Sequence, residues 1–294
     1  MNAPEDVVAF GSERSRPATV SAFTVDVEDY FHVEAFRNVV DPADWESMEQ
    51  RVEPNTRRLL GLLDEFGVKG TFFVLGWVAE RRPGLVRDIQ AAGHELAIHG
   101  YDHRPITMMT PTAFREDLRR AKGIVEDLTG ARVLGYRAPT YSVVRETLWA
   151  LDVMIDEGLG YDSSIFPIAH DRYGIPGAQR HPWVERRDDG ALTEFPISTV
   201  SLGGRNLPFV GGGYLRLLPM SYVRWGMRRV TQAERRPAML YVHPWEIDPG
   251  QPVMEVGRLQ RIRHYRGLGR MEQRLRILLA EFRFDTVRSV LDLG

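Results

Sequence analysis

A repeating order of strand, helix and glycine constrains the fold of this 294-residue chain most strongly. Each unit has an apolar or alternating stretch typical of a strand, then a stretch typical of a helix that ends at a glycine. The expected strands are residues 22–28, 70–75, 94–99, 132–137 and 160–163. The helices between them are expected at residues 54–66, 83–92, 111–129 and 145–157. Such βαβ units build a parallel sheet with right-handed crossovers, so the sequence predicts a barrel or a doubly wound sheet.

The second half of the chain departs from this repeat. Residues 164–215 are rich in proline and glycine, which predicts a long loop with one strand at residues 192–197. Regular structure is expected to resume in segments 219–232 (helix), 239–243 (strand), 271–282 (helix) and 283–287 (strand), before a short helical tail. No linker interrupts the pattern, so we expect one domain over residues 19–294, preceded by a flexible polar arm at residues 1–18.

Composition excludes several classes of protein. The 38 basic and 40 acidic side chains give a net charge of −2, without the basic surplus of a nucleic-acid-binding protein. No glycine-rich phosphate-binding motif follows the first strand. Cysteine is absent, so any metal must be bound by His, Asp or Glu. The first residues lack the apolar core of a signal peptide and no apolar run could span a membrane, so we expect a cytoplasmic protein.

An HxxxH pair, His99 and His103, directly follows the third expected strand. Histidines at this spacing can bind one metal from a tight loop, although two unrelated surface histidines would look the same. On the first strand, Asp26 and Glu28 lie two residues apart, so both carboxylates point to one face. Active sites of α/β barrels gather at the carboxyl edge of the strands. Glu28 or Asp29 with the two histidines would supply three metal ligands and leave a position open for water, unless this is simply a solvated acidic strand end.

Two further strand ends add complementary groups. Arg137 precedes a turn that Pro139 opens, and His243 ends an apolar strand. Taken alone, Arg137 could be a surface arginine in a turn and His243 a histidine packed at a strand end. Carboxylates, a histidine pair, an arginine and another histidine at four strand ends together predict one catalytic site.

The order of these motifs resembles that of the polysaccharide deacetylase family, also called carbohydrate esterase family 4 or the NodB homology family. The resemblance runs from about residue 22 to residue 244, and residues 26–32 and 243–249 are similar to a branch that accompanies exopolysaccharide and exosortase clusters in Gram-negative bacteria. It implies a distorted (β/α)7 barrel as a single domain, with a long loop insertion and a C-terminal helical extension at about residues 250–294. The implied activity is a metal-dependent N-deacetylase acting on N-acetylhexosamine units of an exopolysaccharide or its lipid-linked precursor.

The resemblance also implies roles for the residues that match the motifs. Asp26 would be the general base, which Arg137 holds ionised and oriented. His243 would be the general acid, and Asp162 would orient it and favour its charged form. Glu28 would join the two histidines on a divalent metal, which we expect to be zinc, with Co²⁺, Ni²⁺ or Mn²⁺ as alternatives.

Substrate contacts follow from the same resemblance. The backbone N–H of Thr140 would stabilise the oxyanion, and Leu240 would line the pocket for the acetyl methyl group. Tyr141 and Trp245 are expected to contact the sugar. In its first motif this chain departs from the commoner family pattern, because Val27 separates the two carboxylates and leaves the choice between Glu28 and Asp29 open.

Two other functions fit the same residues. One is hydrolysis of another acyl or cyclic amide on the same barrel. The other is a non-catalytic glycan-binding protein, which the presence of both Asp26 and His243 disfavours. The expected partner is an N-acetylated oligosaccharide, polysaccharide or lipid-linked glycan, and no nucleic acid. Peripheral contact with a membrane surface or a diphosphate could come from arginines near residues 219–232, unless these lie on an ordinary solvated helix: Arg216, Arg224, Arg228 and Arg229.

Overall fold

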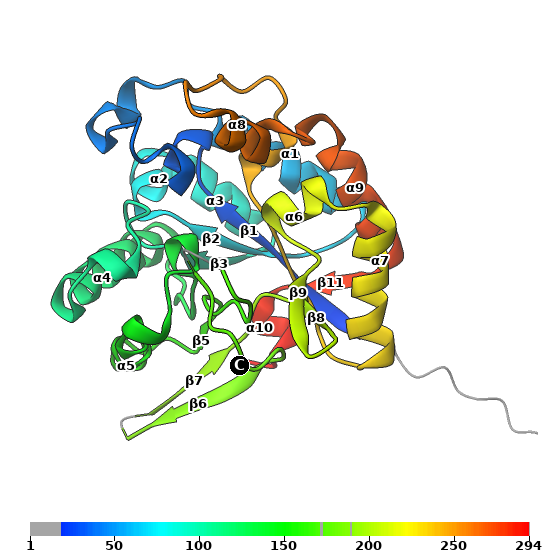
Figure 1. The fold of residues 1–294 in the computed structure, drawn as a ribbon. Helices are drawn as coiled ribbons and strands as arrows, with labels where there is room; N and C mark the ends of the chain where they lie inside the picture. The colour runs from blue at the N-terminus through cyan, green and yellow to red at the C-terminus, as the bar shows by residue number, and fades with distance from the viewer. Residues whose placement is uncertain (1–18, 171–172, 189, 294) are drawn as a thin grey trace, which may run out of the picture.

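The computed structural model describes residues 19–170, 173–188 and 190–293 (Figure 1). The arm expected at residues 1–18 lies outside the described residues. The centre is a sheet in the order β10-β1-β2-β3-β4-β5-β7-β6, with β11 beside β1, and every pair is parallel except β6-β7. The parallel strands are β1 (Val20–Val27), β2 (Thr71–Val74), β3 (Glu95–Ile98), β4 (Gly135–Tyr136), β5 (Tyr161–Asp162), β7 (Gly190–Glu194), β10 (Met239–Val242) and β11 (Arg283–Asp285).

Helices connect the strands, as the repeating pattern predicts. Those of the first half are α1 (Val52–Glu65), α2 (Gly76–Arg81), α3 (Pro83–Ala91), α4 (Pro111–Thr129) and α5 (Trp149–Asp156). Those of the second half are α6 (Gly212–Leu217), α7 (Met220–Arg228), α8 (Arg258–Tyr265), α9 (Leu268–Glu281) and α10 (Val287–Val290). Gly130 shows why glycine ends these helices, since it adopts φ 64° after α4, where a side chain would be strained.

The parallel strands form an incomplete barrel, which confirms the predicted α/β fold. Within the described part of the chain, β7 and β10 do not pair, so the sheet is open between them. The segment after β7 bridges this gap. The Met239 N–H at the start of β10 donates to the Ser198 hydroxyl at 2.7 Å, and the Ile197 N–H donates to the Ile165 carbonyl at 3.2 Å.

The single strand expected between residues 164 and 215 was an underestimate. β6 (Trp183–Arg187) pairs with β7, and β8 (Thr199–Leu202) pairs with β9 (Arg205–Pro208). Gly203 and Gly204 join the second hairpin with φ of 57° and 75°, a turn that strongly favours glycine. The glycine pair was therefore a hairpin signal rather than a loop signal.

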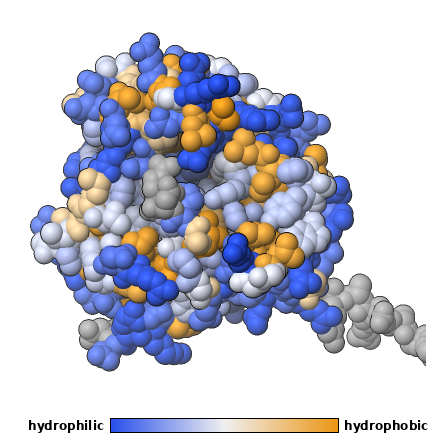
Figure 2. All heavy atoms as spheres, viewed as in Figure 1, coloured by the Kyte–Doolittle hydropathy of each residue, from blue (hydrophilic) through white to orange (hydrophobic). Residues whose placement is uncertain are grey.

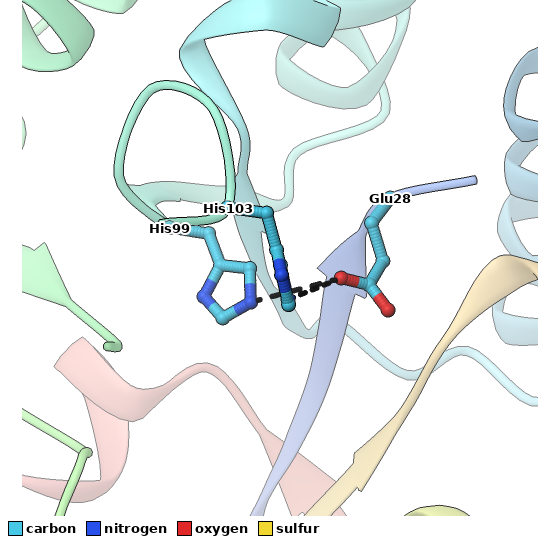
Figure 3. Close-up of side chains that lie close together, drawn as sticks. All are labelled: Glu28, His99 and His103. Atoms are coloured by element: carbon cyan, nitrogen blue, oxygen red, sulfur yellow. Dashed lines mark ion pairs between the residues drawn. The ribbon is translucent and has the colours of Figure 1, made fainter. Parts of the chain in front are cut away.

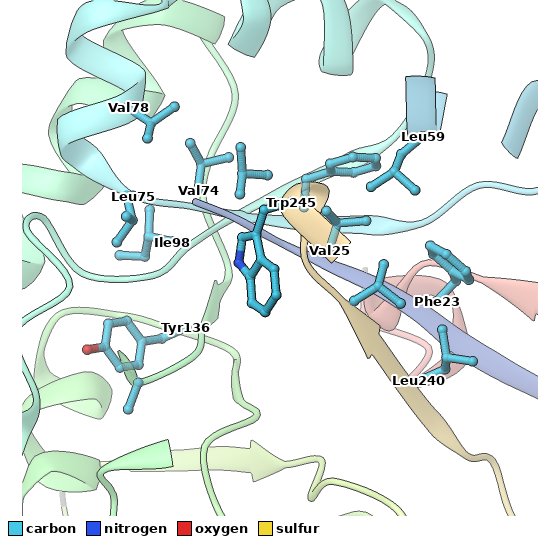
Figure 4. Packing of buried hydrophobic residues seen from close by; sticks show 14 of the residues in the cluster. Phe23, Val25, Leu59, Val74, Leu75, Val78, Ile98, Tyr136, Leu240 and Trp245 are labelled. Carbon is cyan, nitrogen blue, oxygen red and sulfur yellow. The ribbon is translucent and has the colours of Figure 1, made fainter. Parts of the chain in front are cut away.

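Alternation along the strands separates the hydrophobic core from the site. Phe23 and Val25 on β1 pack with Leu240 on β10 and Leu59 on α1 in the main cluster (Figure 4). The intervening side chains of β1, among them Asp26, point to the other face. One strand thus supplies both core and chemistry. Among the described residues, no helix is both long and apolar enough to cross a membrane.

Candidate active site

The carboxyl ends of four strands meet at a cavity of about 190 Å³. β1, β3, β4 and β10 each lead into it, which is the edge that the sequence predicts. The structure brings together these predicted site residues on its wall: Asp26, Glu28, His99, His103, Thr140, Tyr141, His243 and Trp245.

Glu28, His99 and His103 form a buried group of possible metal ligands (Figure 3). Glu28 Oε2 lies 2.8 Å from His103 Nε2 and 4.0 Å from His99 Nε2. The Arg137 carbonyl lies 2.8 Å from His99 Nδ1 and can only accept, so Nδ1 is protonated and Nε2 is left with a lone pair toward Glu28. Glu28 Oε2 is buried and points at the two histidines rather than at a backbone donor. Two imidazole nitrogens and one such carboxylate fit a divalent metal site with open positions.

The electrostatic environment favours the metal-binding forms of these side chains. Burial alone would raise the pKa of Glu28, but the neighbouring histidines His103, His243 and His99 outweigh it and lower that pKa. Burial lowers the pKa of His99 to about 4. At neutral pH Glu28 is therefore an anion and His99 a neutral imidazole, as metal ligation requires.

Asp29, the alternative ligand, is used elsewhere. Its Oδ2 accepts the backbone N–H groups of Arg51 at 2.7 Å and Val52 at 2.8 Å, where α1 begins. Its Oδ1 accepts the Tyr30 N–H at 2.9 Å. With both oxygens turned to backbone donors, Asp29 anchors α1, and Glu28 is the carboxylate that faces the histidines.

The loop after β3 turns His103 back toward His99. Gly100 and His103 adopt φ of 73° and 56°, so the chain reverses within a few residues. The first two N–H groups of α2 donate to carbonyl oxygens of this loop at 2.9 Å each. This strained turn is held by its neighbours, as is common at functional sites.

Asp26 and Arg137 form a fully buried ion pair. Arg137 donates from one terminal nitrogen to Asp26 Oδ1 at 2.6 Å and to the Thr24 hydroxyl at 2.9 Å. Its other nitrogens reach the carbonyl and hydroxyl oxygens of Ser163, and its guanidinium lies 4.1 Å over the Phe73 ring. The pairing leaves Asp26 Oδ2 near His243 Nε2, at 3.8 Å.

His243 takes its carboxylate partner from Glu246, so the expectation that Asp162 would orient it was wrong. His243 Nδ1 lies 3.1 Å from Glu246 Oε2, in the turn directly after β10. Asp162 instead accepts the Ser164 hydroxyl and pairs with Glu194, which lies opposite it on β7. Burial alone would lower the pKa of His243, but the hydrogen bond to Glu246 and the nearby carboxylates raise it to about 9.

Arg216 was also predicted wrongly, because the sequence grouped it with arginines that could contact a membrane surface or a diphosphate. It is buried and donates to Glu246 Oε1 at 2.6 Å and to the His264 carbonyl at 2.6 Å, so it cannot grip a diphosphate or a membrane. Two other expected surface arginines, Arg224 and Arg228, pair with Glu281. Glu246 did have a signal in the sequence. It lies three residues after His243, which caps the turn, and this is the spacing of a capping box.

Tyr141 and Trp245, the two residues expected to contact the sugar, are both largely buried. Thr140 and Tyr141 adopt φ of 58° and 52°, a pair of left-handed non-glycine residues at the cavity wall. Trp245 donates from Nε1 to Glu28 Oε1 at 3.1 Å. Its ring stacks against His243 and His264, with centroids 5.0 and 4.3 Å apart. Trp245 is also only 5% exposed, so little of the indole can meet a ligand.

Leu240 does not line the cavity, and its predicted role was wrong. Its side chain is fully buried in the main core, where Figure 4 shows it near Phe23, its partner in the β1-β10 register. Residues of one strand alternate between faces, so Tyr241 and His243 point to the cavity and Leu240 points away.

Two family models match the chain. Residues 44–154 match the model described as polysaccharide deacetylase, and residues 163–292 match a domain of unknown function, DUF3473. The histidine pair lies in the first match and His243 in the second.

Curated relatives match a little over a third of the chain. Over 110 residues it is 36% identical to a peptidoglycan deacetylase-like protein of Gibberella zeae. Over 108 residues it is 31% identical to a peptidoglycan deacetylase of Helicobacter pylori. Each alignment covers 37% of this chain but only 32% and 36% of the relatives, so the match spans about a third of their length.

Solved structures match nearly the whole length of the chain. A Mycobacterium smegmatis protein classed as a polysaccharide deacetylase superposes with a TM-score of 0.58 at 25% identity, over 97% of this chain and 98% of that one. An allantoinase superposes with a TM-score of 0.59 at 19% identity, over 99% and 97% of the two chains, which shows a common fold and no more.

Proposed function

This chain carries a polysaccharide deacetylase domain of the NodB, or carbohydrate esterase 4, family, and on that premise we propose that it is a metal-dependent N-deacetylase. It would remove acetyl groups from N-acetylhexosamine units of an exopolysaccharide or of its lipid-linked precursor in the cytoplasm. One observation carries the proposal: Asp26, paired with Arg137, and His243 face the Glu28-centred ligand group across a single cavity.

Hydrolysis of the acetamide forms a bond from a water oxygen to the carbonyl carbon and breaks the C–N bond, releasing acetate and an amine. Glu28, His99 and His103 would hold a divalent metal, zinc in our proposal, which when bound polarises the carbonyl and lowers the pKa of water. Asp26 is suited to accept the water proton, because Arg137 binds Oδ1 at 2.6 Å and leaves Oδ2 toward the cavity.

His243 is suited to protonate the leaving amine. Its pKa of about 9 keeps it protonated at neutral pH, and its Nε2 lies 3.8 Å from Asp26 Oδ2 and 3.7 Å from Glu28 Oε1. The two proton-transfer groups therefore stand side by side. The N–H of Thr140 would stabilise the oxyanion, and Tyr141 would contact the sugar from the adjoining wall.

Acetate release tests the proposal. Chitooligosaccharides and a lipid-linked N-acetylglucosamine mimic would be incubated with zinc-loaded protein, chelator-treated protein, Asp26→Asn and the control Asp44→Asn, an exposed aspartate. We expect release by the zinc-loaded protein and by Asp44→Asn only. Release that survives in Asp26→Asn would overturn the assigned mechanism. Metal binding without release would favour another amide substrate, and neither would favour a glycan-binding protein.

A further inference from the structure

A second cavity adjoins the catalytic one. It has a volume of about 630 Å³, and Val33 and Trp245 line both cavities. One of its walls is α8, including Arg258 and Leu259 in the first turn and Arg263 in the last. Because the two cavities share part of their walls, a ligand whose sugar occupies the first could extend into the second. Glycans and lipid-linked sugars are both long enough to need such a neighbouring site.

The charge of this second cavity is one-sided. Three arginines line it, Arg216, Arg258 and Arg263, and no acidic side chain among the described residues does. Arg216 is already bound to Glu246. Arg258 and Arg263 are exposed, and over residues 19–170, 173–188 and 190–293 no carboxylate lies within 4.0 Å of either guanidinium.

Some arginines elsewhere at the protein surface are paired with carboxylates. Arg224 and Arg228 both bind Glu281, and Arg276 binds Glu65. Figure 2 shows hydrophilic and hydrophobic residues side by side over α8, at the top of the view. A wall that combines Leu259 with two free guanidinium groups is suited to a ligand with an apolar body and an anionic group.

We propose that the cavity under α8 is a subsite for an anionic group attached next to the acetylated sugar. The group is a carboxylate or a phosphate, since both match the planar donors of a guanidinium. The inference rests on the proposed deacetylase activity and extends it to the substrate. A uronic acid in a polymer and the diphosphate of a lipid-linked precursor are the two sources of such a group.

Steady-state kinetics with three substrates tests the subsite. The probes are tetra-N-acetylchitotetraose (below, chitotetraose), which is neutral, a hyaluronan tetrasaccharide, which carries uronates, and UDP-N-acetylglucosamine, which carries a diphosphate. The variant is the double substitution Arg258→Gln and Arg263→Gln. The matched control is Arg261→Gln, an exposed arginine of the same helix that does not line the cavity.

In the double variant we expect KM for one anionic substrate to rise about tenfold, with kcat unchanged and chitotetraose unaffected. Arg261→Gln should behave as the wild type with all three. The anionic substrate that responds identifies the source as uronate or diphosphate. Equal effects of both variants, or equal KM values for all three substrates in the wild type, would overturn the subsite and leave the deacetylase intact.

Binding separates the subsite from catalysis. Titration calorimetry with the same three compounds on zinc-loaded Asp26→Asn, with and without the double substitution, measures affinity with no turnover. An anion-dependent loss of affinity of about tenfold supports the subsite even if none of the probes is hydrolysed. No difference between the anionic and neutral probes would overturn it.

Discussion

Glu246 accepts two hydrogen bonds from His243, one from its backbone N–H at 3.0 Å and one from its Nδ1 at 3.1 Å. Arg216 binds the other carboxylate oxygen at 2.6 Å, so Glu246 is satisfied although fully buried. Nδ1 of the imidazole is thereby fixed as a donor, and Nε2 is directed toward Asp26 and Glu28. Charge-assisted hydrogen bonds therefore run from Arg216 on α6 through Glu246 to His243, and so connect α6 with the catalytic cavity.

Replacing Glu246 by Gln should move the alkaline limb of the pH–rate profile. Glu246 helps to raise the pKa of His243 to about 9, so the protonated acid is present below that pH and is lost as the pH rises through it. Gln keeps the shape but removes the charge, which lowers the His243 pKa. We expect the limb of kcat/KM to move down by about one pH unit or more, checked by NMR titration of the His243 imidazole.

Asp162→Asn is the matched control, because Asp162 pairs with Ser164 and Glu194. It should leave the His243 titration where it is. A shift in Asp162→Asn together with none in Glu246→Gln would restore the role that the family resemblance implies for Asp162.

Periodicity explains how much of this site the sequence could predict. Asp26 and Glu28 share a face because side chains alternate along a strand, and the same rule, applied to His243, would have excluded Leu240. The partner of His243 depends on structure that periodicity does not describe. Glu246 reaches it through a short turn, while Glu194 pairs with Asp162 from β7, a predicted strand whose position beside β5 periodicity does not specify.

Glu28→Gln and Asp29→Asn should separate metal binding from stability. Glu28 faces the two histidines, so its substitution should weaken zinc binding by at least about tenfold. Asp29 instead binds backbone N–H groups at the start of α1, so Asp29→Asn should retain zinc but lose about 1–2 kcal/mol of unfolding free energy. Zinc stoichiometry and urea unfolding of the two variants check this. Zinc lost in Asp29→Asn alone would reverse the ligand assignment.

Gly211→Ala should disturb the cavity through Tyr241. Gly211 has φ +90°, and an added Cβ would lie 2.1 Å from Cε1 of the Tyr241 ring, which lines the catalytic cavity. The ring must move, so we expect lower kcat/KM and a loss of about 2–3 kcal/mol of stability. Gly203→Ala is the control, since its φ is +57° and no atom lies within 4 Å. It should cost only about 1 kcal/mol and leave activity unchanged.

Asp162 and Glu194 should make stability depend on pH. They lie opposite each other on β5 and β7, both fully buried. Burial raises the pKa of Asp162 to about 6 and that of Glu194 well above its usual value. Asp162 Oδ2 and Glu194 Oε2 accept no hydrogen bond from a donor in the described residues, an arrangement that one shared proton satisfies.

The sign of this effect follows from the raised pKa values. An unfolded chain releases both protons near pH 4, so the stability from the protonated pair is fully present below that pH. It is lost as the pH rises through about 6, the pKa of Asp162 in the fold. The contribution of this pair to the stability of the wild-type protein should therefore be lost between pH 5 and pH 8, as measured by urea unfolding of the wild type against Glu194→Gln.

Glu194→Gln should flatten this dependence. Gln needs no proton, and its carbonyl oxygen can keep the bond that Glu194 Oε1 accepts from the Ile165 N–H at 3.0 Å. We expect the variant to lose about 2 kcal/mol less than the wild type over the same interval. The control Glu146→Gln, at an exposed position, should follow the wild type. A Glu194→Gln protein with the wild-type pH dependence would show that the two carboxyl groups do not share a proton.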